Sequence, residues 1–443
     1  GRITYNYDNR YFVEGNFGYN GSENFSPNHR FGFFPSIALG YVVSNEKFFA
    51  PIRDVVSMVK LKASYGLVGN DQIGGDRRFI YNETVIGGGK YYFGTTPSQY
   101  TSVRLGEFPN PNVGWEKAKK LNLGADLSFF NQLNISVDYF KENREGIFLQ
   151  RKSIPMYVGL STKPWVNIGK MRNSGIDASL EYHQPLGKDL HLTVRGNFTY
   201  ARNRIMDQDE PDYAYTYMNH SGQMQWQKFG LVAAGLFQDQ EDIDSWAKQS
   251  FGEVKPGDIK YLDLNGDGIV DNYDTKPIGY SDIPEIVYGF GFSLQWKAFD
   301  LSAFFQGVAH VSFSTLTDQT QAFVGRNLKE SSVFADLYGN TWTPENPGAK
   351  YPRMTTGAID NNNQLSTFWM ANGRYLRLKN LELGYTLPKR IANKIAMQSL
   401  RVYLSGVNLF TFSPFKLWDP DLQTGATNYP NNRIINLGLT IGF

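Results

Sequence analysis

Oxygen-bearing side chains recur at alternate positions of one short segment, DLNGDGIVDNYD, which spans residues 263–274. The Gly at position 6 of this twelve-residue segment allows a sharp turn. Hard Ca²⁺ takes about six to eight oxygen ligands, and this spacing of Asp and Asn supplies them. We therefore predict a structural Ca²⁺ site here. Its predicted ligands are Asp263, Asn265, Asp267, the backbone carbonyl of Ile269, Asp271 and Asp274.

The last position of the loop departs from the usual pattern. Asp274 stands where a calcium loop normally has Glu, whose longer arm reaches the ion with both oxygens. The alternative is a turn of Asn, Asp and Gly residues that is stabilised by its own side-chain-to-backbone hydrogen bonds. Neither reading gives a catalytic metal, because no His or water-activating base accompanies the segment.

Catalytic patterns are missing from the rest of the sequence. The five His residues show no metal-ligand spacing, and no nucleophile elbow or phosphate-binding loop occurs. The net charge of +2 gives no reason to expect a nucleic-acid partner. With no Cys in the chain, disulfides and thiolate metal sites are excluded. The sequence does not predict an enzyme.

The elements that must position these residues are strands. Aromatic residues make up 15% of the chain and charged residues 19%, and many segments alternate apolar and polar residues with a period of two. In YLRLKNLELGYTLP the alternation slips by one residue at Lys379 and Asn380, which predicts a β-bulge. The predicted strands lie near 2–8, 10–20, 32–45, 56–68, 115–130, 132–147, 168–184, 189–204, 284–297, 299–313, 371–387, 398–411 and 431–443.

Connections between these strands alternate between short and long. The long ones include roughly 69–114, 205–283 and 314–370. Short turns at one end and long loops at the other are typical of transmembrane β-barrels, as are strands longer than about nine to eleven residues. Aromatic residues gather near both strand ends, as expected at the two membrane interfaces: Tyr182 lies near the short turns, and Tyr139, Phe140 and Tyr200 lie at the opposite strand ends. The fold class predicted is all-β, a transmembrane antiparallel β-barrel, with the long loops outside the cell.

Several blocks of the sequence resemble the SusC/RagA family of TonB-dependent outer-membrane transporters. They include RYFVEGNFGYNGSENF (11–26), VKLKASYGLVGNDQIG (59–74), PGDIKYLDLNGDGIVDNYDTKPIG (256–279) and LRVYLSGVNLFTFSPFKLWDPD (400–421). The blocks occur in the family's order along nearly the whole chain. The resemblance implies a barrel of about 22 strands. It also implies an N-terminal plug, a TonB-box peptide and a SusD-like surface lipoprotein that closes over the barrel.

Neither plug nor TonB box is visible in the sequence, which opens directly on strand-like residues. We therefore expect residues 1–443 to be the C-terminal portion of the barrel of a longer polypeptide. The TonB complex would then act through the missing N-terminal region.

The C-terminal segment INLGLTIGF ends in an aromatic residue, and it resembles the signal read by the outer-membrane assembly machinery. An ordinary closing strand is the alternative. The residues of the predicted assembly signal are Ile435, Leu437, Leu439, Ile441 and Phe443.

The polar faces of the strands should line the lumen. Predicted lumen-facing residues are Asn122, Asp126, Asn134, Asp138, Asp177, Glu181, Arg195, Asn197 and Arg377. Large aromatic residues in loops could contact a sugar, although such residues also simply pack loops together. The candidate ligand contacts are Trp165, Trp226, Tyr215 and Tyr217.

Together these observations predict active import of a nutrient, an oligosaccharide or an oligopeptide, across the bacterial outer membrane. Expected partners are a SusD-like lipoprotein, the TonB complex and outer-membrane lipid. Two alternatives stay open: a passive outer-membrane porin, and a secreted glycan-binding β protein whose calcium-style loop docks a scaffold.

Overall fold

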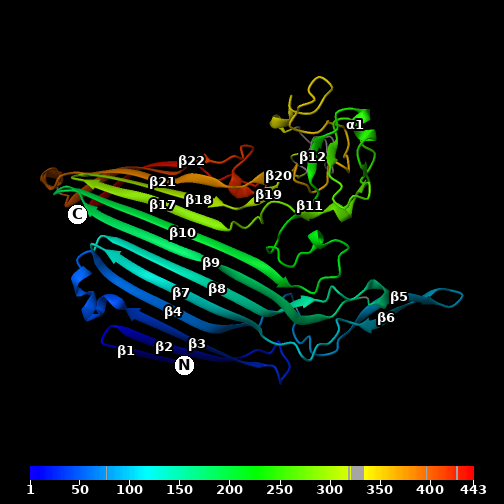
Figure 1. Cartoon of the computed structure of the whole chain (residues 1–443), viewed down its shortest axis with the longest axis horizontal. Coiled ribbons are helices and arrows are strands. Elements are labelled where there is room, and N and C mark those ends of the chain that lie inside the picture. Colours follow the sequence, from blue (N-terminus) through cyan, green and yellow to red (C-terminus); the bar gives the residue numbers. More distant parts are fainter. Residues whose placement is uncertain (76, 161, 318–319, 321–333, 396, 426–427) are drawn as a thin grey trace.

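A computed structural model describes residues 1–75, 77–160, 162–317, 320, 334–395, 397–425 and 428–443. Thirteen strands form one curved antiparallel sheet, and their order in space follows their order in the chain (Figure 1). They lie within a few residues of the predicted ranges. The strands are β1 (Arg2–Tyr7), β2 (Tyr11–Gly21), β3 (Phe31–Val42), β4 (Val56–Asn70), β7 (Glu116–Phe129), β8 (Leu133–Gln150), β9 (Trp165–Pro185), β10 (Leu190–Asp207), β17 (Ile286–Trp296), β18 (Phe299–Ala309), β21 (Tyr375–Thr386), β22 (Ser399–Phe412) and β23 (Ile434–Gly442).

The register keeps apolar residues of successive strands on one face of the sheet. Leu123 on β7 pairs with Ala63 on β4 and Tyr139 on β8, and Leu383 on β21 pairs with Leu404 on β22. This face is uncovered, since 46% of Leu123 and 51% of Leu383 is exposed. An apolar surface that runs across the whole sheet requires an apolar surrounding, which lipid tails provide.

The opposite face is polar. Asp126 pairs with Ser136, and Glu181 pairs with both Asn134 and Arg195. All the residues predicted to line the lumen share this face through the continuous register. The sheet therefore has the two-faced wall of a transmembrane β-barrel, and the predicted fold class is confirmed.

Two details of the strand pattern can be checked directly. The predicted bulge is confirmed, because the register on both sides of β21 skips Lys379. The prediction that Phe140 belongs with Tyr139 and Tyr200 at the lipid interface is wrong. Phe140 pairs with Asn122 and therefore lies on the polar face, whereas Tyr139 and Tyr200 lie on the apolar one.

The two ends of the sheet differ. At one end, tight turns join β1 to β2, β7 to β8, β9 to β10 and β17 to β18. Phe130 and Asn131 adopt φ values of 53° and 54°, the left-handed backbone that a tight hairpin needs. The connections 43–55 and 387–398 at this end are longer than predicted and coil into short helices. These helices are η1 (Val43–Asn45), η2 (Lys47–Ile52), α2 (Lys389–Ala392) and η7 (Asn393–Ile395).

All the long connections leave the opposite end, called the long-loop end here (Figure 1). Small sheets form inside them: β5 (Val85–Phe93) with β6 (Ser98–Leu105), β11 (Phe229–Gly230) with β16 (Lys276–Pro277), β12 (Ala233–Leu236) with β14 (Ile259–Tyr261), β13 (Lys248–Gln249) with β15 (Ile269–Val270), and β19 (Ser312–Ser314) with β20 (Met370–Asn372). Their helices are α1 (Gln240–Asp244), η3 (Met156–Val158), η4 (Thr216–Met218), η5 (Asn272–Asp274), η6 (Ala335–Leu337) and η8 (Pro420–Leu422). None of the helices in the described residues is long and apolar enough to cross a membrane.

Candidate functional site

Connections 208–285 and 310–374 fold together at the long-loop end into one unit with its own core. The core contains residues from both connections, so neither could bury its apolar residues alone. Its fully or nearly buried members are Leu231, Leu236, Ile259, Tyr261, Val270, Leu337, Trp342, Tyr351 and Trp369.

Buried hydrogen bonds hold these two connections in a fixed position relative to each other. The carboxylate of Asp258 is wholly buried and accepts hydrogen bonds from Asn362 Nδ2 at 2.9 Å and Arg353 Nη2 at 3.1 Å. Tyr261 donates its hydroxyl to the carbonyl of Asn361 at 2.9 Å, and burial raises the pKa of Tyr261. Each such bond contributes about 1 kcal/mol to the free energy of unfolding. Removing one partner lowers stability by more than that, because the other group stays buried without a hydrogen bond.

A third connection, 413–433, packs against this unit. The rings of Phe415 and Trp418 lie 5.0 and 6.4 Å from the ring of Phe313. Gln423 donates to the backbone carbonyl of Asp282 at 2.5 Å. Connections 208–285, 310–374 and 413–433 thus form one body, called the loop cluster below.

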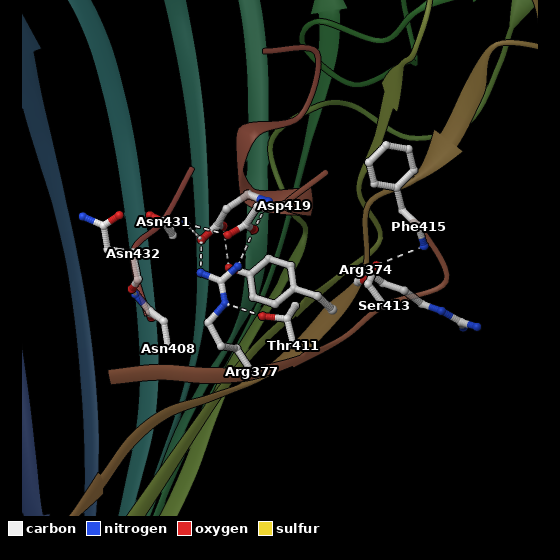
Figure 2. Close-up of polar contacts among 11 residues, drawn as sticks. Arg374, Arg377, Asn408, Thr411, Ser413, Phe415, Asp419, Asn431 and Asn432 are labelled. Carbon is white, nitrogen blue, oxygen red and sulfur yellow. Dashed lines mark hydrogen bonds and ion pairs between the residues drawn. The ribbon is translucent and has the colours of Figure 1, made fainter. Parts of the chain in front are cut away.

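An ion-pair network draws connection 413–433 over the polar face of the sheet. Figure 2 shows Arg377 of β21 reaching into this connection. Only 1% of Arg377 is exposed, and it donates to Asp421 Oδ2 at 2.9 Å, to Asp419, and to Thr411 Oγ1 at 3.0 Å. Arg377 pairs with Gln306 on the polar face, so both aspartates lie on the lumenal side.

The acceptors around Arg377 are held by further groups. Tyr375 donates its hydroxyl to Asp421 Oδ1 at 2.6 Å. Asn431 Nδ2 donates to Asp419 Oδ2 at 3.1 Å (Figure 2). A planar guanidinium matched to two carboxylates fixes orientation as well as distance. The network therefore positions the whole segment that contains Phe415.

A cleft of about 420 Å³ lies between connections 310–374 and 413–433. Aromatic side chains and charges of both signs line it. They include Tyr351, Phe368, Trp369, Phe415, Asp336, Lys350 and Lys416.

The charges in the cleft are organised around Asp336. This carboxylate accepts hydrogen bonds from Lys350 Nζ at 2.6 Å and from the Tyr351 hydroxyl at 2.5 Å. The Lys350 hydrogen bond, together with that of Tyr351, holds the pKa of Asp336 below its ordinary value. Flat apolar rings beside fixed polar groups suit a solute that has both apolar faces and hydrogen-bonding groups.

The polar face of the sheet also carries charges, which are arranged in local sets. In each set a cation contacts one or two carboxylates on neighbouring strands. Three of these sets are Lys62 with Asp126 and Asp138, Arg195 with Glu181, and Arg401 with Asp300 and Glu382.

Comparison with known proteins assigns the chain to a family. A family model described as TonB dependent receptor-like, beta-barrel matches residues 1–409. The chain belongs to this family. The predicted location in the bacterial outer membrane follows from the family and is confirmed.

Relatives agree with the resemblance seen in the sequence. The TonB-dependent receptor P3 of Formosa agariphila is 30% identical over the whole chain, which covers 45% of that receptor. The TonB-dependent receptor SusC of Bacteroides thetaiotaomicron is 27% identical, with 43% of it covered. The structure of the RagAB peptide transporter superposes with a TM-score of 0.76 at 23% identity, covering 100% of this chain and 47% of the other. The chain thus spans about half the length of the receptors it matches.

In the present chain, the side chains of the predicted calcium ligands accept hydrogen bonds from backbone groups of their own loop. Asp263 accepts from the backbone N–H groups of Gly266 at 2.7 Å and Gly268 at 2.8 Å. Asp274 is fully buried and accepts from the N–H of Leu264 at 2.7 Å and of Asp271 at 2.8 Å. These bonds match the turn alternative.

Three further predicted ligands behave in the same way, and of these Asp271 accepts from the N–H of Tyr273 at 2.7 Å. Asn265 and Asp267 each accept from an N–H two residues further on, at 3.0 and 2.8 Å, the second donor being Ile269. Within the described residues, no three His, Cys, Asp or Glu side chains gather closely enough to hold a metal ion. The carboxylates retain lone pairs, so Ca²⁺ binding by this loop stays a prediction.

Three of the four candidate ligand contacts are packed. Trp165 stacks on Phe148 with centroids 5.4 Å apart, and the guanidinium of Arg77 lies 4.0 Å from its ring. Tyr215 and Tyr217 stack at 5.3 Å, and the Tyr217 hydroxyl donates to the carbonyl of Tyr273 in the calcium-style loop. Only Trp226 among the four has most of its surface free, at 59%. Ligand contact by any of them stays a prediction.

The predicted assembly signal forms β23. Leu437 and Leu439 are 78% and 58% exposed on the apolar face, where they pair with Leu404 and Val402 of β22. Ile435 and Ile441 share that face, and Phe443 follows the strand with 82% of its surface exposed. This placement agrees with a lipid-facing strand, while recognition by the assembly machinery stays a prediction.

The cleft and the partners of Arg377 were missed by reasoning from sequence. Arg377 was assigned to the polar face, but nothing in its spacing names Asp419 or Asp421 as partners. A usable signal was present in KLWDPD, where two carboxylates flank a Pro directly after Trp418. Such a segment is suited to capture by a buried cation.

Proposed function

We propose that the protein imports a nutrient oligomer actively across the outer membrane, as a SusC-like TonB-dependent transporter. Residues 1–443 would form the C-terminal portion of its barrel. The observation that carries the proposal is the opposition of the two faces, with exposed Leu123 and Leu383 on one and the charge sets of Lys62 and Arg401 on the other. Lipid supports the first face, and water and solute pass along the second.

The barrel in this proposal performs no chemistry. A SusD-like surface lipoprotein would capture the nutrient and close over the long-loop end. The TonB complex, acting on a region outside this chain, would then open the route. Membership of the receptor family supports both partners.

The substrate class in the proposal is an oligosaccharide or an oligopeptide. The cleft beside Phe368 and Phe415 supports an oligomer, because its rings can stack on sugars or on apolar side chains. Its charged groups, Lys350 and Asp336, can hydrogen-bond to hydroxyl or peptide groups. The name of the RagAB peptide transporter lends some weight to the peptide class.

The two alternatives fare differently. A secreted glycan-binding β protein is excluded, because the chain belongs to an outer-membrane barrel family and leaves its apolar face uncovered. A passive porin differs from the proposed importer in one measurable way, since its transport needs no energy.

The test is uptake by cells that carry or lack the gene. Fluorescent oligopeptides and oligosaccharides of matched size are offered with and without a protonophore. Gene-dependent uptake of one class that stops when the proton gradient collapses supports the importer and names its substrate class. Gene-dependent uptake that persists with the protonophore identifies a porin and overturns the proposal.

A further inference from the structure

Basic side chains emerge from the apolar face of the sheet where the lipid-facing band ends. On four adjacent strands the outward residue changes from apolar or aromatic to polar or basic toward the long-loop end. The changes run from Leu121 to Lys119 on β7, from Tyr139 to Lys141 on β8, from Ile176 to Ser174 and Arg172 on β9, and from Tyr200 to Arg202 and Arg204 on β10.

The register shows that these residues face outward and not into the lumen. Tyr139 pairs with Ile176, which pairs with Tyr200, and all three belong to the exposed apolar face. Arg172 pairs with Arg204, and each lies four residues from Ile176 or Tyr200 on its own strand, so both arginines point to the same face of the sheet. Strands β9 and β10 continue past the start of β17 at Ile286, and there backbone groups of Gly222 and Gln223 bond to the edge of β10 at Ile205.

Arg172, Arg202 and Arg204 surround a hollow of about 290 Å³ that Tyr139 and Tyr200 also line. Arg202 is bonded to the buried carboxylate of Glu285 at 2.5 Å. Arg172 donates to Asn143 Oδ1 at 3.1 Å and Arg204 to the carbonyl of Gly222 at 2.7 Å. In the part of the chain that the structure describes, neither of these two arginines pairs with a carboxylate.

The surroundings of the hollow are also positive. Lys141 has no carboxylate partner among the described residues. Lys119 is bonded to Glu145 at 2.9 Å, and Lys170 lies 3.9 Å from Asp207. The outward surface therefore keeps an excess of positive charge.

This position corresponds to the headgroup layer of a membrane. Tyrosine rings at the edge of an apolar band sit at the level where hydrocarbon meets water, and cations just beyond them lie among the lipid headgroups. Arginine forms paired hydrogen bonds with phosphate oxygens, and basic pockets on membrane proteins bind anionic headgroups.

We propose that the hollow formed by Arg172, Arg202 and Arg204 binds the phosphate of a phosphorylated lipid in the outer leaflet. Arg172 and Arg204 would supply the guanidinium donors, while Tyr139 and Tyr200 would contact the glycerol or sugar backbone of the lipid. The inference rests on the outer-membrane location and is independent of what the protein transports.

The test uses the complete protein purified in detergent and studied by native mass spectrometry. Phosphorylated lipid A is titrated in, and the same lipid with its phosphates removed is the matched probe. We expect the phosphorylated lipid to bind at least about tenfold more tightly, which is the effect of losing one charge-assisted contact. Equal binding of the two lipids would overturn the proposal.

Variants locate the site. Arg172→Gln with Arg204→Gln should lower affinity for the phosphorylated lipid by about tenfold or more, in line with the two lost charge-assisted contacts. Arg195→Gln, on the lumenal side of β10, is the matched control for each single variant, because it removes one guanidinium from the opposite face, where Arg195 is paired with Glu181. If the double variant fails to fold, each single variant is measured instead. Unchanged binding in the arginine variants, or an equal loss in the control, would contradict the site.

A final arm separates lipid from free phosphate. Inorganic phosphate at millimolar concentration should leave the bound lipid in place, because the lipid also contacts the tyrosines and the apolar band. Displacement by inorganic phosphate would show an anion site and not a lipid site. Loss of lipid binding with intact nutrient uptake would leave the transport proposal standing.

Discussion

The guanidinium of Arg377 donates from Nη1 to Oδ2 of Asp421 across 2.9 Å, although 44 residues separate them in the chain. The bond connects a wall strand with a loop that would otherwise extend away from the sheet. The last long connection is therefore part of the lumenal surface, and the aromatic residues that follow β22 are placed by a buried charge.

Replacing Arg377 with Gln should release connection 413–433. Removing one partner of a buried ion pair typically costs about 3–5 kcal/mol, because the carboxylates that remain are left without compensation. Hydrogen exchange within 413–433 should accelerate while β21 itself stays protected. Arg374→Gln is the control, since the Arg374 side chain is exposed and contributes only its carbonyl to Ser413 (Figure 2). Similar exchange in both variants would show that the network does not hold the loop.

The two faces of the sheet should respond oppositely to a new charge. Leu383→Arg places a cation on the lipid face and should cost about 2–4 kcal/mol near the membrane midplane. Ser405→Arg places the same side chain on the polar face, beside Glu382, where the cost should be small. Urea unfolding of the protein in lipid vesicles measures both. A larger loss for Ser405→Arg would mean that the faces are assigned the wrong way round.

Acid should loosen the segment around His220. The imidazole stacks on Phe229 with centroids 3.9 Å apart, and burial lowers its pKa from 6.5. A lowered pKa means that the folded segment binds a proton less readily than the unfolded one. Its stabilising effect is complete above about pH 6.5 and is lost as the pH falls through the folded-state pKa.

Hydrogen exchange of residues 216–231, corrected for the intrinsic effect of pH, should therefore rise below pH 6.5. His220→Phe keeps the stacking without a titrating group, and its corrected exchange should not depend on pH. A persistent pH dependence in that variant would assign the effect to another group.

Calcium binding by the loop 263–274 can be decided by titration. If Ca²⁺ binds only the folded loop, an excess of about 100 times Kd should add about 2.7 kcal/mol of stability. Asp263→Asn combined with Asp267→Asn should abolish that gain, whereas Asp244→Asn in α1 should not. If millimolar Ca²⁺ changes neither the hydrogen exchange of the loop nor the melting temperature, the loop is a hydrogen-bonded turn that does not bind Ca²⁺.

The cleft makes a separate prediction about the nutrient. Phe368→Ser removes a ring from the cleft lining and should lower uptake by about tenfold, in line with the loss of one buried aromatic contact. Trp226→Ser is the comparison, because Trp226 is a large exposed ring that does not line the cleft. If Trp226→Ser lowers uptake more than Phe368→Ser does, the nutrient contacts Trp226 and not the cleft.

The wall was predictable because its signals are local. Alternation along INLGLTIGF and the slip at Lys379 each depend on neighbouring residues, so the strand positions and the bulge follow from short windows. The loop cluster was not predictable in this way. Its core joins Tyr261 to Trp369, and the folding of either connection depends on the other. Trp165 was expected in a loop but begins β9, and its packing could not be predicted because the Arg77 that covers it lies on a different connection.

The charge sets on the polar face have a consequence for selectivity. The three sets hold three cations, Lys62, Arg195 and Arg401, against five carboxylates, so their formal net charge is −2. Along these stretches of the conduit lining, anionic cargo would meet a higher electrical barrier than cationic cargo. The conduit would thus add its own preference for charge to whatever selection the entrance makes.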